Sequence, residues 1–277
     1  MKARIPNALQ VHQMTIAQFQ NQFPDEDACK EYLSVNRWPE VVQCPRCGNP
    51  NVYVLETRAY HWQCHNCAVD GYRFSVLVGT IFENTNKPLH DWFRVMHMML
   101  TSKKGISALQ VYRVMGFGSY NTALLMCNKI RAAFGNVEFK RLIGYVEVYE
   151  TYTGRKAKNK HKGPGGRGDF GGTGGHGKAI IAGAVKRKGN VIARVIANTS
   201  AETLSAFVRM AVSTRVSLVS TDEHKGYTGL HHLVKRGIVG TFHKVSKKYL
   251  PLYVNEFEFR CNNCHNADIF GTAIPAC

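Results

Sequence analysis

The spacing of hydrophobic positions changes from one region of the chain to the next. Within residues 1–37, apolar side chains recur three or four residues apart in two short runs, 15–23 and 26–33, with Pro24 and Asp25 between them. Residues three and four apart share one face of a helix, and Pro followed by Asp favours a helix start. We therefore expect a helical lead-in over residues 1–37.

Helical spacing returns over residues 87–140. The run from His90 to Leu100 carries a methionine-rich apolar stripe, which is more typical of a packed core than of a cofactor site. Two further helical runs, 105–115 and 119–134, flank a turn that contains glycine. This order predicts a helix-turn-helix, in which the second helix enters the major groove of DNA, and a plain helical hairpin is the alternative.

The C-terminal half is richer in β-branched residues. Three strands are predicted in succession, followed by a helix whose Thr199 and Glu202 fit a capping box, and then by a fourth strand that ends at Thr221-Asp222. The predicted strands cover residues 144–152, 178–185, 190–197 and 216–220, and the predicted helix covers residues 200–212. The fold class is therefore α/β in several domains, with a β-rich core over residues 141–277.

The charge of the chain points to a polyanionic partner. Its 277 residues include 36 Lys and Arg against 19 Asp and Glu, which gives a formal charge of +17. Nucleic acid is the simplest partner for such a chain, and a solvated basic surface is the alternative. No apolar run is long enough to span a membrane, and the N-terminus lacks the apolar segment of a secretory signal.

Two CxxC pairs carry the clearest chemical signal. Cys44 and Cys47 form the first pair, and Cys64 and Cys67 form the second. Two such turns on neighbouring hairpins supply four thiolates for a tetrahedral zinc ion, so residues 38–76 are expected to form a zinc ribbon. Four thiolates leave no open coordination position, which predicts structural rather than catalytic zinc; redox-active pairs are the alternative.

A glycine-rich basic segment interrupts the β-rich region between its first two strands. Nine of the fifteen residues from 163 to 177 are glycine, and no phosphate-binding P-loop pattern is present. The segment is expected to extend a hairpin, where its basic residues either contact phosphates or form a solvated linker.

The second helix of the predicted helix-turn-helix supplies candidate DNA contacts. Ser119, Tyr120 and Asn121 lie at its start, where base edges are met, and Lys129 and Arg131 are expected to reach phosphates. The expected partner of this segment is double-stranded DNA.

Several longer motifs resemble one known family. The chain resembles the zinc-ribbon insertion-sequence transposases, whose eukaryotic relatives are the Merlin elements, over about residues 15 to 272. The motifs that carry the resemblance are FPDEDACKEYL, RWPEVVQCPRCG, FSVLVGTIFENT, KKGISALQVYRVMG, VEVYETYTG, STDEHKGY and KRGIVGTFHKVSKKYLPLYVNEFEFR.

The resemblance implies an RNase-H-like, mixed-sheet core over residues 141–277 with a triad of metal ligands. In such cores one carboxylate lies on the first strand, a second lies at the end of the fourth strand, and a third ligand, acidic or amide, lies on a later helix. Together they hold two Mg²⁺ or Mn²⁺ ions. Asp222 matches the second position. The resemblance further implies binding and cutting of DNA at the ends of the element, a location in the bacterial cytoplasm at the nucleoid, and a possible homo-oligomer.

Two positions depart from the family pattern. Tyr149 stands where the resemblance implies the first aspartate, and a neutral phenol is a poor ligand for a hard cation. Residues 230–234 run directly into Lys235 and Arg236, two further candidate DNA contacts, where the family carries the segment with the third ligand. The core is therefore expected to be truncated and its catalysis impaired. The alternatives are a non-enzymatic DNA-binding protein derived from a transposase and, as a weaker reading, a ribbon-type transcription factor.

Overall fold

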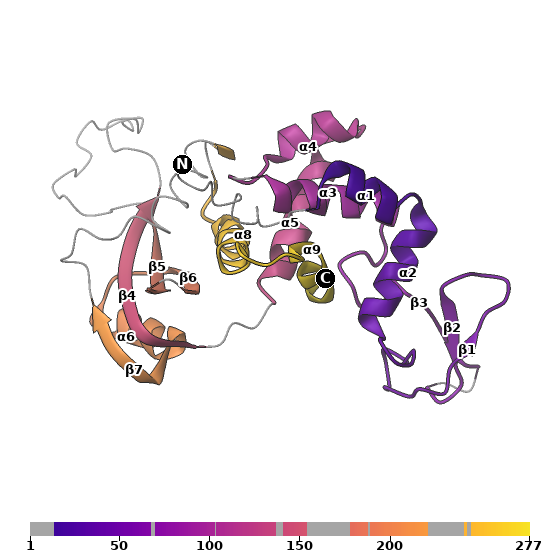
Figure 1. The fold of residues 1–277 in the computed structure, drawn as a ribbon, viewed down its shortest axis with the longest axis horizontal. Helices are drawn as coiled ribbons and strands as arrows, with labels where there is room; N and C mark the ends of the chain where they lie inside the picture. The colour runs from indigo at the N-terminus through magenta and orange to yellow at the C-terminus, as the bar shows by residue number, and fades with distance from the viewer. Residues whose placement is uncertain are drawn as a thin grey trace, which may run out of the picture. The chain divides into compact units, whose positions relative to one another are not determined.

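The computed structural model describes residues 14–67, 70–102, 104–136, 141–153, 178–187, 189–220, 241–242 and 245–277. The chain folds into two compact units (Figure 1). The first unit comprises residues 1–137 together with Cys264–Cys277, and the second comprises Glu138–Asn263. The glycine-rich segment from 163 to 177, residues 230–234, Asp222, Lys235 and Arg236 lie outside the described residues.

The first unit is helical apart from one small sheet. Its helices are α1 (Ile16–Gln22), α2 (Glu26–Arg37), α3 (Leu89–Thr101), α4 (Ala108–Met115), α5 (Tyr120–Phe134) and α9 (Ile269–Ala273), which is followed by a 3₁₀ turn (Ile274–Ala276). Its sheet has the strand order β1 (Tyr53–Val54), β2 (His61–Cys64) and β3 (Tyr72–Ser75), and both strand pairs are antiparallel.

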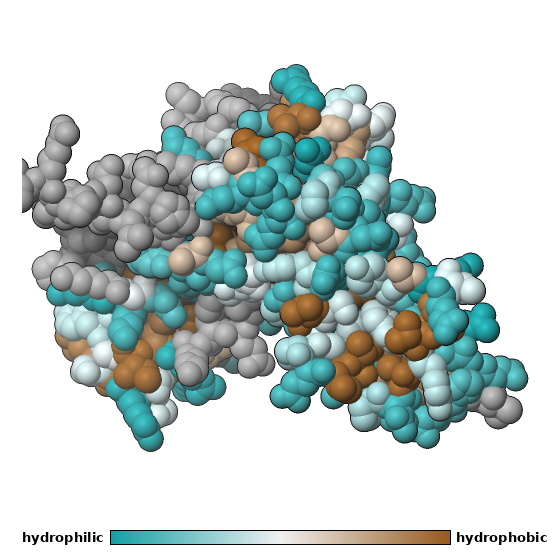
Figure 2. Space-filling model, turned by 45° about the vertical axis from the view of Figure 1, so that its right-hand side comes forward, coloured by the Kyte–Doolittle hydropathy of each residue, from teal (hydrophilic) through white to brown (hydrophobic). Residues whose placement is uncertain are grey.

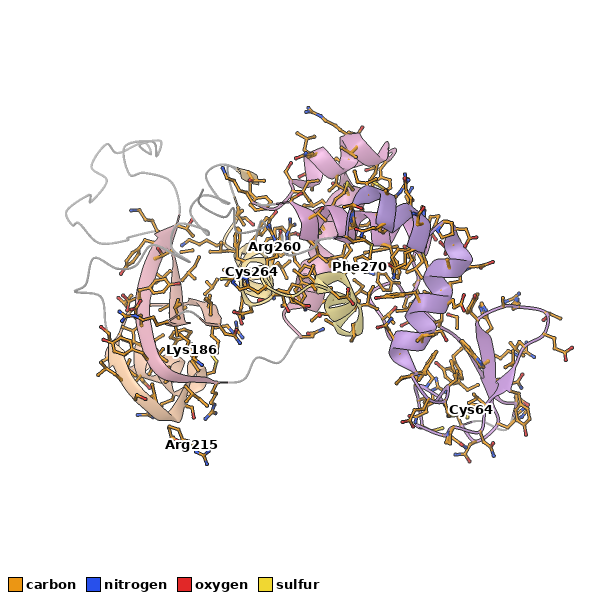
Figure 3. All side chains as sticks on the ribbon, in the orientation of Figure 1. Cys64, Lys186, Arg215, Arg260, Cys264 and Phe270 are labelled. Carbon is orange, nitrogen blue, oxygen red and sulfur yellow. The ribbon has the colours of Figure 1, made fainter. Side chains whose placement is uncertain are left out.

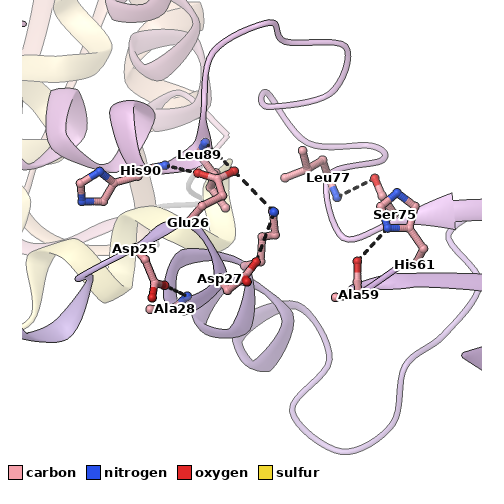
Figure 4. Close-up of polar contacts among 11 residues, drawn as sticks. Asp25, Glu26, Asp27, Ala28, Ala59, His61, Ser75, Leu77, Leu89 and His90 are labelled. Atoms are coloured by element: carbon pink, nitrogen blue, oxygen red, sulfur yellow. Dashed lines mark hydrogen bonds and ion pairs between the residues drawn. The ribbon is translucent and has the colours of Figure 1, made fainter. Parts of the chain in front are cut away.

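The local start signals of the first two helices behave as the sequence predicts. Thr15 caps α1 and forms a reciprocal capping box with Gln18, and the Asp25 carboxylate accepts from the Ala28 N–H at the start of α2. Glu26 then acts over a longer range, because its carboxylate accepts from the backbone N–H groups of Leu89 and His90 at 3.0 and 2.9 Å (Figure 4). Glu26 thereby caps α3, whose own N-cap residue, a proline, offers no side-chain acceptor.

An aromatic core holds the helices of the first unit together. Phe93 of α3 meets Phe23 and Phe270 edge-on, with ring centroids 5.1 and 5.4 Å apart. Phe270 (Figure 3) belongs to α9 near the C-terminus, so the last residues of the chain complete the N-terminal unit. The predicted domain over residues 141–277 therefore differs from the structural division, in which Cys264–Cys277 belong to the first unit and the second unit ends at Asn263.

The second unit is a mixed sheet with a helix on each face. Its elements are β4 (Leu142–Thr153), β5 (Ala179–Lys186), β6 (Val191–Ile196), α6 (Ala201–Ala211), β7 (Val212–Ser220) and α8 (Leu250–Asn262). The strand order is β6-β5-β4-β7, in which β4 pairs antiparallel with β5 and parallel with β7. Three strands, a helix and a fourth strand beside the first agree with the expected RNase-H-like core, and the α/β class is confirmed.

Alternation along β4 divides its side chains between two cores. Val146 and Val148 pack toward α6 with Phe207, whereas Tyr149 packs toward α8 with Phe257. Because successive residues of a strand point to opposite faces, the two clusters follow directly from the pattern of the sequence. One detail of the prediction is wrong: α6 is capped by Ser200, whose hydroxyl accepts from the Thr203 N–H, rather than by Thr199.

Candidate functional site

The first pair of ribbon cysteines lies in a tight turn that needs glycine. The Gly48 N–H donates to the Cys44 carbonyl at 2.8 Å, and the Cys44 N–H donates to the Asn49 carbonyl at 3.0 Å. Gly48 has φ +71°, a left-handed conformation that side-chain-bearing residues rarely adopt. This turn brings the sulfurs of Cys44 and Cys47 toward the same point.

The second pair meets the first at distances that suit zinc. Cys64 ends β2 (Figure 3), and Cys67 follows three residues later. The Sγ atoms of Cys44 and Cys67 are 3.4 Å apart, those of Cys47 and Cys64 are 3.7 Å apart, and all four lie within 4.8 Å of one another. A tetrahedral ion with Zn–S bonds of about 2.3 Å separates its sulfurs by about 3.8 Å, so the donor set fits zinc.

Hydrogen bonding among the thiols makes their acidities unequal. The hydrogen bond with Cys67 is the largest of the effects that lower the pKa of the Cys47 thiol to about 7. The same contact raises the pKa of the Cys67 thiol. The Cys47 thiol therefore gives up its proton more readily than the Cys67 thiol, and a divalent cation that binds all four sulfurs displaces the protons that remain on the four thiols.

Aromatic side chains pack together in the ribbon. Trp62 on β2 stacks on Phe74 of β3 with centroids 5.8 Å apart, and Trp38 meets Trp62 edge-on at 5.3 Å. Figure 2 shows hydrophobic side chains at the surface of the ribbon end of the unit. Among the residues of the ribbon, Val41 and Val54 are 51% and 67% exposed. The cysteine cluster is thus joined through Cys64 to a small sheet with aromatic packing of its own.

Tyr149 is buried in the core of the second unit. It is 6% exposed and packs with Ile181, Leu250 and Phe257 of the α8-side cluster. Burial raises the pKa of its phenol above the ordinary value for tyrosine, so the group is neutral at physiological pH. At the position where the sequence implies the first metal-binding aspartate, the structure places an uncharged ring inside an apolar cluster.

Glu147, two residues earlier on the same face, has a different partner. Its Oε1 lies 3.4 Å from Nη2 of Arg187, whose guanidinium also stacks on the Tyr145 ring at 4.7 Å. Glu147 is paired in register with Ser220, the last residue of β7. Asp222 follows Ser220 by two residues and lies outside the described part of the chain. Arg187 had no signal in the sequence, because only the strand register brings it to Glu147.

The predicted helix-turn-helix consists of α4, a short turn and α5. Gly116 ends α4 with φ +64°, and Ser119 caps α5 by accepting from the Asn121 N–H at 3.2 Å. Tyr120 and Asn121 are exposed at the start of α5, as the prediction requires. Ser119 therefore has a structural task as well as its predicted contact with DNA.

The two basic residues of α5 are engaged inside the unit. Arg131 is fully buried, and its guanidinium lies 3.4 Å from the Ile106 carbonyl oxygen, to which it donates. A phosphate has no access to this group, so the predicted contact of Arg131 with DNA is wrong. The Lys129 amine donates to the Ile81 carbonyl at 3.1 Å and faces the Trp92 ring, which directs it toward α3.

Comparison with known families agrees with these features. The ISXO2-like transposase domain matches residues 141–235 and 231–262, and the transposase zinc-ribbon domain matches residues 24–69. The chain matches no curated relative and no solved structure. Among the described residues, no helix has the length and apolar character needed to cross a membrane. The two matched domains, the four converging cysteines and the order of the sheet together establish that this chain belongs to the zinc-ribbon transposases with an ISXO2-like transposase domain.

Proposed function

We propose that this chain binds double-stranded DNA at the ends of its own insertion-sequence element and that its strand-cleaving and strand-joining activity is impaired. The burial of a neutral tyrosine at the first catalytic position is the observation that carries this proposal. The family supplies the reaction, which is metal-dependent transfer of a DNA strand, and this chain's own residues supply the reason for its impairment.

The charge distribution supports DNA binding. Residues 92–137, which include α4 and α5, contain six Lys and Arg residues and no Asp or Glu. Carboxylates near a docked duplex would repel its phosphates, so their absence over this sequence favours contact with DNA. The helix-turn-helix geometry exposes Tyr120 and Asn121, and Lys235 and Arg236 remain candidate contacts from the sequence.

The residues that the family would use for two Mg²⁺ or Mn²⁺ ions do not fit that task here. A buried, neutral phenol offers no anionic oxygen to a hard cation, and the neighbouring Glu147 is paired with Arg187. Among the residues that the structure describes, the only group of three or more candidate metal ligands is the set of four cysteines. We therefore derive no reaction step through a metal pair.

The predicted absence of the third metal ligand is the second reason to expect impaired catalysis. The two stretches matched by the transposase domain, 141–235 and 231–262, meet where the sequence predicts a deletion. A match in two pieces is what a missing internal segment would produce. With that segment absent, Asp222 is the single acidic residue of the expected triad that the chain retains.

A strand-transfer assay tests the proposal. The zinc-loaded full chain is incubated with duplexes that carry the DNA flanking its gene, in Mg²⁺ or Mn²⁺. We expect a retarded complex on a native gel and no cleaved or joined product. Metal-dependent product that disappears on Asp222→Ala would overturn the impairment, and absence of any complex would overturn the DNA-binding role.

The second candidate is a non-enzymatic DNA-binding protein derived from a transposase. The burial of Tyr149 also favours it, because this side chain now serves the core. Binding without cleavage is expected of both candidates, so the preferred binding site separates them. An impaired transposase should bind the ends of its own element most tightly, whereas a repurposed DNA-binding protein should prefer duplexes outside the element. Light scattering on the same complex reports whether two or more copies assemble on DNA.

A further inference from the structure

The solvent-facing side of α5 has an unusual composition for a surface that meets DNA. Tyr120 and Leu125 are 43% and 58% exposed, and Asn121 and Ala132 are exposed with them. None of these side chains is charged. The opposite side is buried against the rest of the unit through Ala123, Met126, Cys127 and Ile130.

The turn before α5 fixes which side faces outward. Phe117 in this turn is 6% exposed, and the Lys87 amine lies 4.9 Å from the centre of its ring. The Ser119 cap fixes the first turn of the helix, and the buried Arg131 ties its last turns to the Ile106 carbonyl. The exposed face is therefore presented by a supported helix, which favours precise contacts.

Asn121 and Leu125 lie on the same face, one helical turn apart. Four residues of α-helix rise about 6 Å, whereas successive base pairs are about 3.4 Å apart along the duplex. When a helix lies along the major groove, two side chains with this spacing meet neighbouring base pairs or pairs separated by one. The two residues can therefore contact one short sequence together.

We propose that this face selects A·T pairs at neighbouring positions, with Asn121 recognising adenine and Leu125 contacting the methyl group of thymine. The inference rests on the proposed DNA-binding function. A carboxamide offers one donor and one acceptor, which match N6 and N7 of adenine, and thymine alone offers an apolar methyl group in the major groove. Bidentate recognition of guanine uses Arg or Lys. Of the two basic residues of α5, Arg131 is buried and the half-buried Lys129 donates to the Ile81 carbonyl.

The test begins with selection of duplexes by the zinc-loaded full chain from a library of short random sequences at fixed salt. Fluorescence anisotropy on the selected duplex then compares the wild type with Asn121→Ala and Leu125→Ala. We expect Asn121→Ala to weaken binding roughly 5- to 150-fold. Replacement of adenine by 7-deazaadenine removes N7, so it should weaken the wild type but have little effect on Asn121→Ala.

Leu125 has a matching chemical probe. Replacement of thymine by deoxyuridine removes the methyl group, and we expect a loss of about threefold to fivefold that is absent in Leu125→Ala. Asn136→Ala, which changes an exposed amide beyond the end of α5, and Val114→Ala, which changes an exposed aliphatic residue of α4, are the controls. Circular dichroism verifies that each variant is folded.

The outcomes separate this inference from the function on which it rests. Binding with no sequence preference, or a preference that both variants retain, would overturn the assignment of the two residues and leave DNA binding intact. Selection of G·C pairs opposite α5 would overturn it as well. Failure of the full chain to bind any duplex would overturn the proposed function and this inference together.

Discussion

The ring of Tyr149 on β4 lies across Gly183, its direct partner on β5. A Cβ placed on Gly183 would lie 2.5 Å from Cζ and 2.6 Å from the phenol oxygen of Tyr149. The absence of a side chain at Gly183 therefore makes room for an aromatic ring at the position where the family pattern implies an aspartate. This pair links the tyrosine at the position of the implied aspartate to the packing of the sheet.

Gly183→Ala should destabilise the protein through Tyr149. The added methyl group would lie 2.5 Å from the ring, closer than side chains normally approach, and the ring is packed with Leu250 and Phe257 of α8, so it has little room to move. We expect the free energy of unfolding to fall by about 1–3 kcal/mol, the usual cost of overpacking a core. Urea unfolding monitored by circular dichroism measures it.

A double variant isolates the contact. In a Tyr149→Val background the ring is absent, so Gly183→Ala should cost little, and Gly118→Ala, where a Cβ meets no atom within 4 Å, serves as the neutral control. If Gly183→Ala costs the same in both backgrounds, the ring is not the cause of the destabilisation.

Restoring the implied aspartate should not restore catalysis. Tyr149→Asp removes a large buried side chain and places a carboxylate in an apolar cluster, which we expect to cost about 3–5 kcal/mol from lost packing alone. The predicted deletion of the segment with the third ligand would still be in place. We therefore expect a lower melting temperature and no metal-dependent cleavage.

Tyr152→Asp is the matched control for this change. Tyr152 is on the same strand but is 41% exposed, so an aspartate there should leave the melting temperature nearly unchanged. Cleavage of flanking DNA by Tyr149→Asp in Mn²⁺ would show that the substitution at this position alone accounts for any loss of activity.

Zinc should be present in one copy per chain and should maintain the ribbon. Cys47→Ser removes one of four ligands, so we expect the metal to be lost and the near-ultraviolet signal of the stacked Trp62 and Phe74 to weaken. Native mass spectrometry measures the metal. Cys264→Ser, which changes an exposed cysteine outside the cluster, should retain it. Full zinc occupancy in Cys47→Ser would contradict the four-ligand assignment.

The sequence predicts features that depend on neighbouring residues better than contacts between residues far apart in the chain. The cysteine knuckles and the succession of strands along the chain follow from local patterns and were predictable, whereas the packing of Phe270 was not. A five-residue helix gives no sign that it packs on Phe23 and Phe93, far away in the sequence. The predicted contact of Arg131 with DNA was wrong for a related reason. A charged residue on a helix is normally solvated, and the Ile106 carbonyl that accepts from Arg131 is brought to it only by the fold.

Cys29 should resist alkylation in the folded protein. Its side chain is fully buried in α2, and burial is the main effect that raises the pKa of the thiol to about 12. A pKa above the ordinary value means that the thiol stays protonated over the working range, and at pH 8 only about one molecule in 10⁴ carries the reactive thiolate. Iodoacetamide followed by peptide mass spectrometry should therefore label the exposed Cys264 and leave Cys29 unmodified until denaturant is added. Labelling of Cys29 at a rate similar to that of Cys264 in the native protein would mean that α2 opens readily. That result would contradict the burial of Cys29 and Leu33 in the folded helix.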